Sequence, residues 1–97
     1  MSKGYWVVAY RSISDPAKSA AYVKLAVPVI DKARGRYLTL GGQVVAHEAG
    51  VAERTVVIEF DSFELAVATH DSEDYQKALT VLGDGADRDF RIVEGAD

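Results

Sequence analysis

The sequence contains no cysteine, only two prolines and one tryptophan, and two histidines. Without cysteine the chain cannot form a disulfide, a thiolate nucleophile, or a cysteine-ligated zinc or iron–sulfur site. The histidines, His47 and His70, show no short metal-ligand spacing, so neither a metal nor another cofactor is expected. A Gly-x-Ser-x-Gly elbow and a Walker-type phosphate loop are missing as well. These absences leave cofactor-free chemistry, or binding without chemistry, as the available classes of function.

Basic residues are also in the minority, with 11 lysines and arginines against 15 acidic residues and a net charge of −4. Nucleic-acid-binding proteins normally present a basic face, so no nucleic-acid partner is expected. The mean hydropathy of −0.03 argues against a membrane-spanning protein. The first four residues lead into a strand-like segment without a signal-peptide pattern, which predicts a cytoplasmic protein. A length of 97 residues fits one domain over residues 1–97.

The hydrophobic pattern predicts alternating strands and helices. Segments rich in β-branched and aromatic residues are expected to form strands over 5–10, 36–47 with a glycine bend at Gly41 and Gly42, 54–60 and 87–94. Helical spacing is found from Pro16 to about residue 34, and again from 62 to 82 with a restart at Ser72. The order β-α-β-β-α-β predicts an α+β, ferredoxin-like sandwich. In that fold the first and third strands are central in an antiparallel four-stranded sheet, and the helices cover one face.

Two details of the first helix can be predicted. Asp15 is expected to cap its first turn, and Pro28 is expected to kink or split the helix near Val27 because proline lacks an N–H and its ring clashes with the preceding turn. The face turned to the core is expected to carry Ala20, Val23, Val27 and Ile30.

The first strand is apolar or aromatic on both faces. Tyr5, Val7 and Ala9 alternate with the apolar or aromatic residues Trp6, Val8 and Tyr10. Because the helices can cover only one of these faces, the other is expected to be buried by a second copy of the chain. The sequence therefore predicts a homodimer joined through its sheet faces.

Several short segments together resemble one known family. They are Gly4-Tyr5-Trp6, Asp15-Pro16, Tyr22 with Ala26-Val27-Pro28, Gly41-Gly42, Arg54 to Phe60, Ser72 to Gln76, and Ile92 to Gly95. In this order and spacing they resemble the Domain of Unknown Function 1330 family over nearly the whole chain. The resemblance implies the dimeric α+β barrel form of the ferredoxin-like fold, and it implies no particular activity.

The chain departs from the pattern of that family at four positions where relatives often carry residues suited to lining a pocket. Here these positions are Leu40, Thr69, Glu73 and Leu82.

Glu59 is the polar residue expected to matter most, with Arg54 and His47 as further catalytic candidates. Glu59 lies on a central strand, where a carboxylate is costly unless it is paired, hydrogen-bonded or protonated. A simple hairpin turn at 49–52 would place Glu59 near Gly42 and His47 beside Arg54. A structural ion pair or an interface hydrogen bond is the commoner role for such a carboxylate.

The expected substrate-binding residues are aromatic or lie beside aromatic residues: Trp6, Tyr22, His70 and Tyr75. Aromatic residues at these spacings pack more often in a core than around a ligand. Two hypotheses follow. One is a homodimer that binds a small apolar or aromatic molecule between sheet and helices, with cofactor-free proton transfer or substrate-borne oxidation as its chemistry if it is an enzyme. The other is a non-catalytic binding or assembly module with a packed interior; an interior cavity with convergent polar groups would favour the first.

Overall fold

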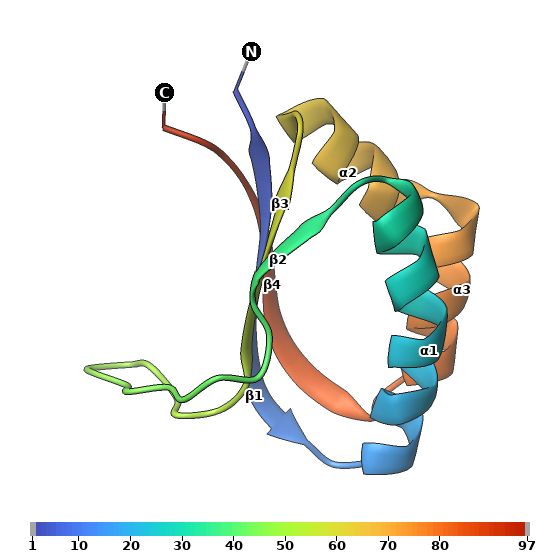
Figure 1. Cartoon of the computed structure of the whole chain (residues 1–97). Coiled ribbons are helices and arrows are strands. Elements are labelled where there is room, and N and C mark those ends of the chain that lie inside the picture. Colours follow the sequence, from blue (N-terminus) through green and yellow to red (C-terminus); the bar gives the residue numbers. More distant parts are fainter. Residues whose placement is uncertain (1, 97) are drawn as a thin grey trace.

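Four strands and three helices follow one another along residues 2–96, which are described by the computed structural model (Figure 1). The elements are β1 (Gly4–Ile13), α1 (Pro16–Lys32), β2 (Arg36–Thr39), β3 (Thr55–Phe60), α2 (Phe63–Asp71), α3 (Glu73–Leu82) and β4 (Ala86–Glu94). This is the predicted β-α-β-β-α-β order, with the second helical region divided into α2 and α3. The α+β, ferredoxin-like prediction is confirmed.

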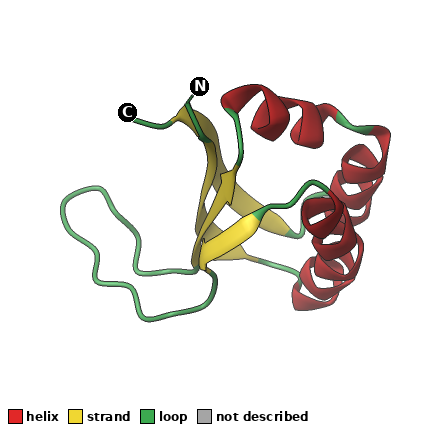
Figure 2. Cartoon of the chain, turned by 45° about the horizontal axis from the view of Figure 1, so that its top comes forward, coloured by secondary structure: helices red, strands yellow, loops and turns green. Residues whose placement is uncertain are grey.

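The four strands form one antiparallel sheet in the order β2-β3-β1-β4. β1 and β3 are central, as predicted, and Val7 pairs with Val57 on one side and with Arg91 on the other. Side chains alternate between the two faces because the strand repeat is two residues. The helices lie on one face only, and the other face is not covered by any described element (Figures 1 and 2).

The core lies between this sheet and the helices. Its largest fully buried side chains are Trp6, Phe60 and Tyr75, from β1, β3 and α3. The indole N–H of Trp6 donates a 2.9 Å hydrogen bond to the carbonyl oxygen of Ala66 in α2, so the buried ring retains its polar partner.

Side-chain caps start all three helices. Asp15 accepts a hydrogen bond from the backbone N–H of Lys18, which confirms the predicted cap of α1. At α2 the cap is Ser62, whose hydroxyl accepts a hydrogen bond from the backbone N–H of Leu65. Ser72 caps α3, and this second cap explains why the helical region restarts there.

Two predictions about α1 are wrong. The buried face carries Ser19, Tyr22, Ala26 and Ile30, so Ala20 is exposed and the buried stripe starts one residue earlier than expected. The helix also continues through Pro28 without division. Pro28 and Lys24 both lie on the exposed side, where water can bond the Lys24 carbonyl that Pro28 leaves unpaired.

The chain leaves the sheet after Thr39, so the predicted strand over 43–47 does not form. The hydroxyl of Thr39 bonds both the backbone N–H of Val57 and the carbonyl of Thr55, at 2.9 and 3.0 Å. A side chain thus occupies the hydrogen-bonding positions that the β2 backbone would need in order to continue. Residues 40–54 form a long loop that projects away from the helices (Figure 2).

None of the helices within residues 2–96 is both long enough and apolar enough to cross a membrane.

Candidate functional site

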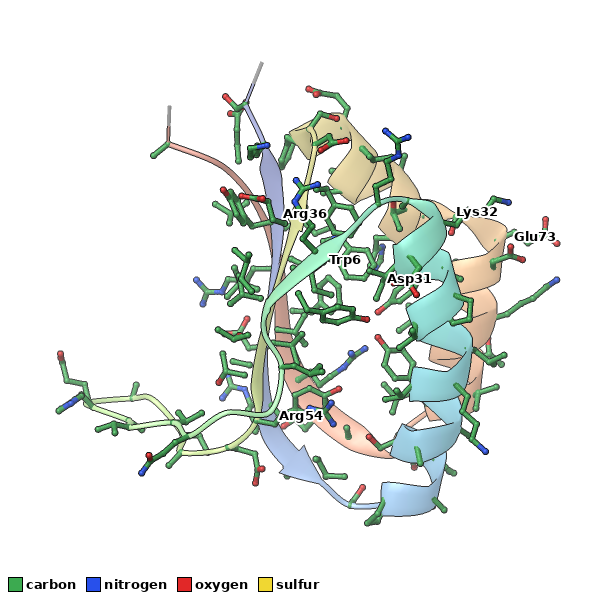
Figure 3. All side chains as sticks on the ribbon, in the orientation of Figure 1. Trp6, Asp31, Lys32, Arg36, Arg54 and Glu73 are labelled. Atoms are coloured by element: carbon green, nitrogen blue, oxygen red, sulfur yellow. The ribbon has the colours of Figure 1, made fainter. Side chains whose placement is uncertain are left out.

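A cavity of about 240 Å³ lies between α1 and the sheet. Its walls come from α1, from every strand and from the two ends of the loop 40–54: Trp6, Val8, Tyr10, Tyr22, Val23, Ala26, Val27, Ile30, Tyr37, Leu40, Arg54, Val56, Ile58 and Arg88. In Figure 3, Trp6 lies in the space between sheet and helices, and Arg54 lies towards the other end of the sheet. The walls are mainly aliphatic and aromatic, with two guanidinium groups as the only charges among these residues.

Two features of the fold create this cavity. α1 packs chiefly against α3, and its sheet-facing side carries the small residue Ala26 at its middle. β2 is only four residues long, so beyond Thr39 no edge strand closes the side of the sheet. Leu40 lines the cavity and is 47% exposed, which places it at the rim.

The polar end of the cavity is a chain of three hydrogen-bonded residues. Nη1 of Arg88 donates to the hydroxyl of Tyr22 at 3.1 Å, and that hydroxyl lies 2.6 Å from the hydroxyl of Tyr75. The three side chains come from β4, α1 and α3, so the site depends on the tertiary fold. Arg88 and Tyr22 line the cavity, whereas Tyr75 lies behind Tyr22 and is fully buried.

Arg88 is surrounded by aromatic rings. Its guanidinium carbon lies 4.8 Å from the ring centre of Tyr22, 5.4 Å from that of Phe90 and 5.6 Å from that of Tyr10. Burial by itself lowers the pKa of Arg88, but the oxygen atoms of Tyr22, Tyr75 and Tyr10 outweigh this effect, so the pKa is raised. The group therefore stays positively charged. Within residues 2–96 no carboxylate forms an ion pair with it.

Arg54 brings a second positive charge to the same cavity. Its guanidinium carbon lies 5.7 Å from the ring centre of Tyr10, and its Nε donates to the carbonyl of Leu40 at 3.3 Å. Tyr10 therefore has a guanidinium from Arg54 and another from Arg88 near its ring.

Two tyrosines, Tyr37 in the cavity wall and Tyr75 behind it, are held in the neutral form. Burial raises the pKa of Tyr37 to about 12. Burial, with the neighbouring Tyr22, also raises the pKa of Tyr75 far above its ordinary value. Their hydroxyl groups can donate and accept hydrogen bonds but are poor proton donors in catalysis near neutral pH.

The structure brings three of the four proposed substrate-binding residues together around Trp6. Tyr75 packs against Trp6 with ring centres 4.9 Å apart, and His70 lies 6.3 Å from Trp6 and 5.3 Å from Tyr75. His70 lies in the last turn of α2 and pairs with Asp71 through Nδ1. Only Trp6 and Tyr22 of the four line the cavity; His70 and Tyr75 support it from behind.

Glu59 lies on the opposite face of the sheet from the cavity. It pairs in register with Tyr5 on β1 and Arg36 on β2, accepting hydrogen bonds of 2.8 Å from the tyrosine hydroxyl and 2.9 Å from Nε of Arg36. The hydrogen bond from Tyr5 and then that from Arg36 lower its pKa. These contacts are those of a cross-strand ion pair on the uncovered face.

The three proposed catalytic residues are not brought together. His47 lies in the exposed loop after β2, and its side chain makes no hydrogen bond or ion pair within residues 2–96. The predicted register is wrong, because Glu59 faces Arg36 rather than Gly42 and no hairpin places His47 beside Arg54. Of the three, Arg54 alone reaches the cavity.

The sequence analysis missed Arg88, Tyr10 and Tyr37 as lining residues. A signal for Arg88 was present, because Arg88, Phe90 and Ile92 alternate along β4 and share the face turned to the helices. A charged residue among aromatic and aliphatic residues on the core side of a strand is unusual and indicates a candidate binding residue. Among the described residues, no cluster of three or more histidine and acidic side chains could hold a metal ion.

Comparison with known proteins gives a consistent fold. The domain of unknown function family DUF1330 matches residues 3–96. A protein of unknown function from Rhodopseudomonas palustris is similar with a TM-score of 0.74 at 12% identity, over 99% of this chain and 84% of that chain. A dimeric ferredoxin-like protein of unknown function from Thermobifida fusca gives 0.51 at 15% identity, covering 96% of this chain and 91% of that one.

A proposed antibiotic biosynthesis monooxygenase from Caulobacter crescentus gives a TM-score of 0.56 at 14% identity, over 99% of this chain and 91% of the other. At such identities the likeness concerns the fold and not the chemistry. No curated protein matches the sequence.

Proposed function

The chain belongs to the DUF1330 family, and we propose that it binds a small apolar or aromatic molecule in the cavity between α1 and the sheet. The observation that carries this proposal is the cavity itself, about 240 Å³ of space in a chain of only 97 residues. A small domain has little apolar surface to spare, and most interiors are filled to high density. An unfilled volume with convergent polar groups at one end is typical of a ligand site.

The lining supports an apolar body for the ligand. Aliphatic side chains from α1, such as Val23 and Val27, face Val56 and Ile58 from β3. Removing apolar ligand surface from water here stabilises a complex by about 25 cal/mol for each Å² buried, before the costs of association. A purely packed assembly module, the alternative hypothesis, gives no reason for this space.

The polar groups favour binding over proton-transfer catalysis. The residues that line the cavity include no carboxylate and no histidine, the groups that most often act as general acid or base. Tyr37, with a pKa of about 12, is poorly matched to proton transfer near neutral pH. We therefore assign Arg54 to ligand contact, and we assign Glu59 and His47 no role in the cavity.

A cavity-filling variant tests this function. Ala26→Leu adds bulk to the lining, and Ala20→Leu makes the same change on the exposed side of the same helix. Indole is the probe, titrated by calorimetry. We expect Ala26→Leu to weaken indole binding at least about 10-fold, a loss of roughly 1.4 kcal/mol. Ala20→Leu should bind like the unmodified chain. Equal binding by Ala26→Leu would contradict the proposed site.

We further propose that two copies of the chain assemble through their uncovered sheet faces. Support comes from the apolar side chains on that face, among them Val7 on β1, Val57 on β3 and the half-exposed Val93 on β4. No described helix covers them (Figure 1). The Thermobifida fusca neighbour, which is dimeric, has the same fold.

Light scattering tests the assembly. The chain should give twice its 10.5 kDa mass at micromolar concentration. Val57→Asp places a charge on the uncovered face and should yield the monomer, whereas Val81→Asp on the outer side of α3 should remain dimeric. A stable 10.5 kDa species for the unmodified chain would contradict a sheet-face dimer.

A further inference from the structure

We infer that the ligand carries a carboxylate, which is bound by the guanidinium of Arg88 and the hydroxyl of Tyr22. This inference rests on the proposed function, because it names the chemistry of the molecule that occupies the same cavity. It follows from two independent observations. One is the hydrogen bonding of the Tyr22 and Tyr75 hydroxyl groups, and the other is the presence in the cavity wall of two arginines that form no ion pair within residues 2–96.

The first observation concerns hydroxyl protons. Tyr75 is fully buried, and among residues 2–96 the acceptor within reach of its hydroxyl proton is the hydroxyl of Tyr22, since Arg88, which also interacts with Tyr75, can only donate. A buried donor without an acceptor is costly, so Tyr75 donates to Tyr22. Arg88 also donates to the Tyr22 oxygen, which fills both of its lone pairs. The proton of Tyr22 is then left to bond a further acceptor.

That acceptor belongs in the cavity. Tyr22 and Arg88 both line it, so their remaining donor capacity is directed at the same region. The guanidinium of Arg88 has five N–H donors, and its hydrogen bond to Tyr22 uses one of them. The end of the cavity thus presents donors of two kinds, a charged fork and a neutral hydroxyl.

The second observation concerns charge. The chain has a net charge of −4, yet the residues that line the cavity include two arginines and no acidic residue. Among residues 2–96, neither Arg54 nor Arg88 forms an ion pair with a carboxylate. A largely buried cation is normally paired, so the cavity lacks one negative charge that a ligand can supply.

A carboxylate fits this site better than a larger anion. Its two oxygens lie in a plane and match the fork of a guanidinium. The rest of the cavity is apolar, which suits a singly charged group attached to a hydrocarbon or aromatic body. Arg54, whose guanidinium carbon also lies near the ring of Tyr10, provides a second positive charge that attracts such a molecule.

Three probes of one shape test the inference: 3-phenylpropionate, its neutral amide, and the cation 3-phenylpropylamine. Binding is measured by calorimetry on the full chain. We expect the carboxylate to bind about 10-fold to 100-fold more tightly than the amide, and the cation to bind most weakly. Arg88→Gln should abolish the preference for the carboxylate while the amide still binds. Tyr22→Phe should reduce it, and Arg88→Lys should retain part of it.

Lys24→Gln is the charge control, since Lys24 is exposed on α1 and forms no ion pair within residues 2–96. It should leave the preference unchanged. Equal affinity for carboxylate and amide in the unmodified chain would overturn the inference and leave the cavity as a neutral binding site. A preference that survives in Arg88→Gln would overturn it too. Failure of all three probes and of indole to bind would overturn the proposed function itself.

Discussion

Tyr5 and Glu59 are direct cross-strand partners on β1 and β3, and the tyrosine hydroxyl donates a 2.8 Å hydrogen bond to the carboxylate. Arg36 on β2 bonds the other carboxylate oxygen at 2.9 Å and also reaches Asp61 at 3.1 Å. One carboxylate therefore links three adjacent strands on the face that no described helix covers. Its role in the isolated chain is to hold the β2 edge to the centre of the sheet.

This arrangement predicts how stability depends on pH. The hydrogen bonds from Tyr5 and Arg36 lower the pKa of Glu59 below its ordinary value of 4.5. Because the pKa of Glu59 is lower in the folded chain than in the unfolded chain, its ionised carboxylate stabilises the fold at pH values above 4.5. This stability is lost as the pH falls through the pKa that Glu59 has in the folded chain. Urea unfolding should show Glu59→Gln less stable than the unmodified chain at neutral pH, with the gap closing below pH 4.5. Glu48→Gln, in the exposed loop, should show no such gap.

The tyrosine pair at the cavity should respond unequally to mutation. Tyr22→Phe removes the acceptor for the buried Tyr75 hydroxyl and is expected to cost about 1–3 kcal/mol of unfolding free energy. Tyr75→Phe removes the donor and leaves Tyr22 bonded to Arg88, so a smaller cost of about 0.5–1.5 kcal/mol is expected. The double variant should cost less than both changes added together. Equal single costs that simply add would argue against this direction of donation.

Gly4 is predicted to resist substitution for a packing reason. A Cβ at this position would lie 2.6 Å from Cα of Phe63 and 2.7 Å from the carbonyl oxygen of Ser62, and both atoms are backbone. Gly4→Ala must therefore shift α2 from β1, at an expected cost of about 1–3 kcal/mol. Gly41→Ala is the control, because a Cβ there meets nothing within 4 Å. A melting temperature of Gly4→Ala equal to that of Gly41→Ala would contradict the close approach.

Tyr37 should ionise later than an exposed tyrosine. Burial raises its pKa to about 12, so an alkaline titration followed by ultraviolet absorbance should lose one late step in Tyr37→Phe. Because the pKa of Tyr37 is raised in the folded chain, the neutral hydroxyl contributes its full stability below pH 10.0, the ordinary pKa of tyrosine. This contribution is lost as the pH rises towards about 12. The Tyr37→Phe variant should accordingly show a weaker alkaline loss of stability. Loss of a step near pH 10 instead of the late step would place Tyr37 in water.

The fold could be predicted from local patterns because these patterns agree with one another. Composition identifies β1 and β3 as strands, the order of the elements places both at the centre of the sheet, and Asp15 and Ser72 mark where helices start. The strand expected over 43–47 failed for a non-local reason. Val44 and Val45 have the right composition, but the hydroxyl of Thr39 occupies the bonding positions on β3. Composition alone does not reveal that interaction.

The site could be predicted only in part. Trp6 and Tyr22 follow from aromatic composition, whereas Arg54 was expected as a catalytic residue beside His47 and lies instead in the wall of the cavity. The cavity depends on how far α1 stands from the sheet, which its packing against α3 sets. The buried face of α1 also includes Ser19. The spacing of apolar residues does not identify a polar residue on the core face, so the position of this face could not be predicted correctly.

The single tryptophan gives this protein a built-in optical reporter. Trp6 is 1% exposed, lines the cavity, and packs against Phe60, Tyr75 and Phe90 with ring centres 4.9 to 5.2 Å apart. Its fluorescence should shift when the chain unfolds, because water then reaches the indole. The fluorescence should change in a different way when a ligand enters the cavity, because the indole ring then contacts the ligand and remains shielded from water. Folding and occupancy can therefore be followed in the same sample without a label.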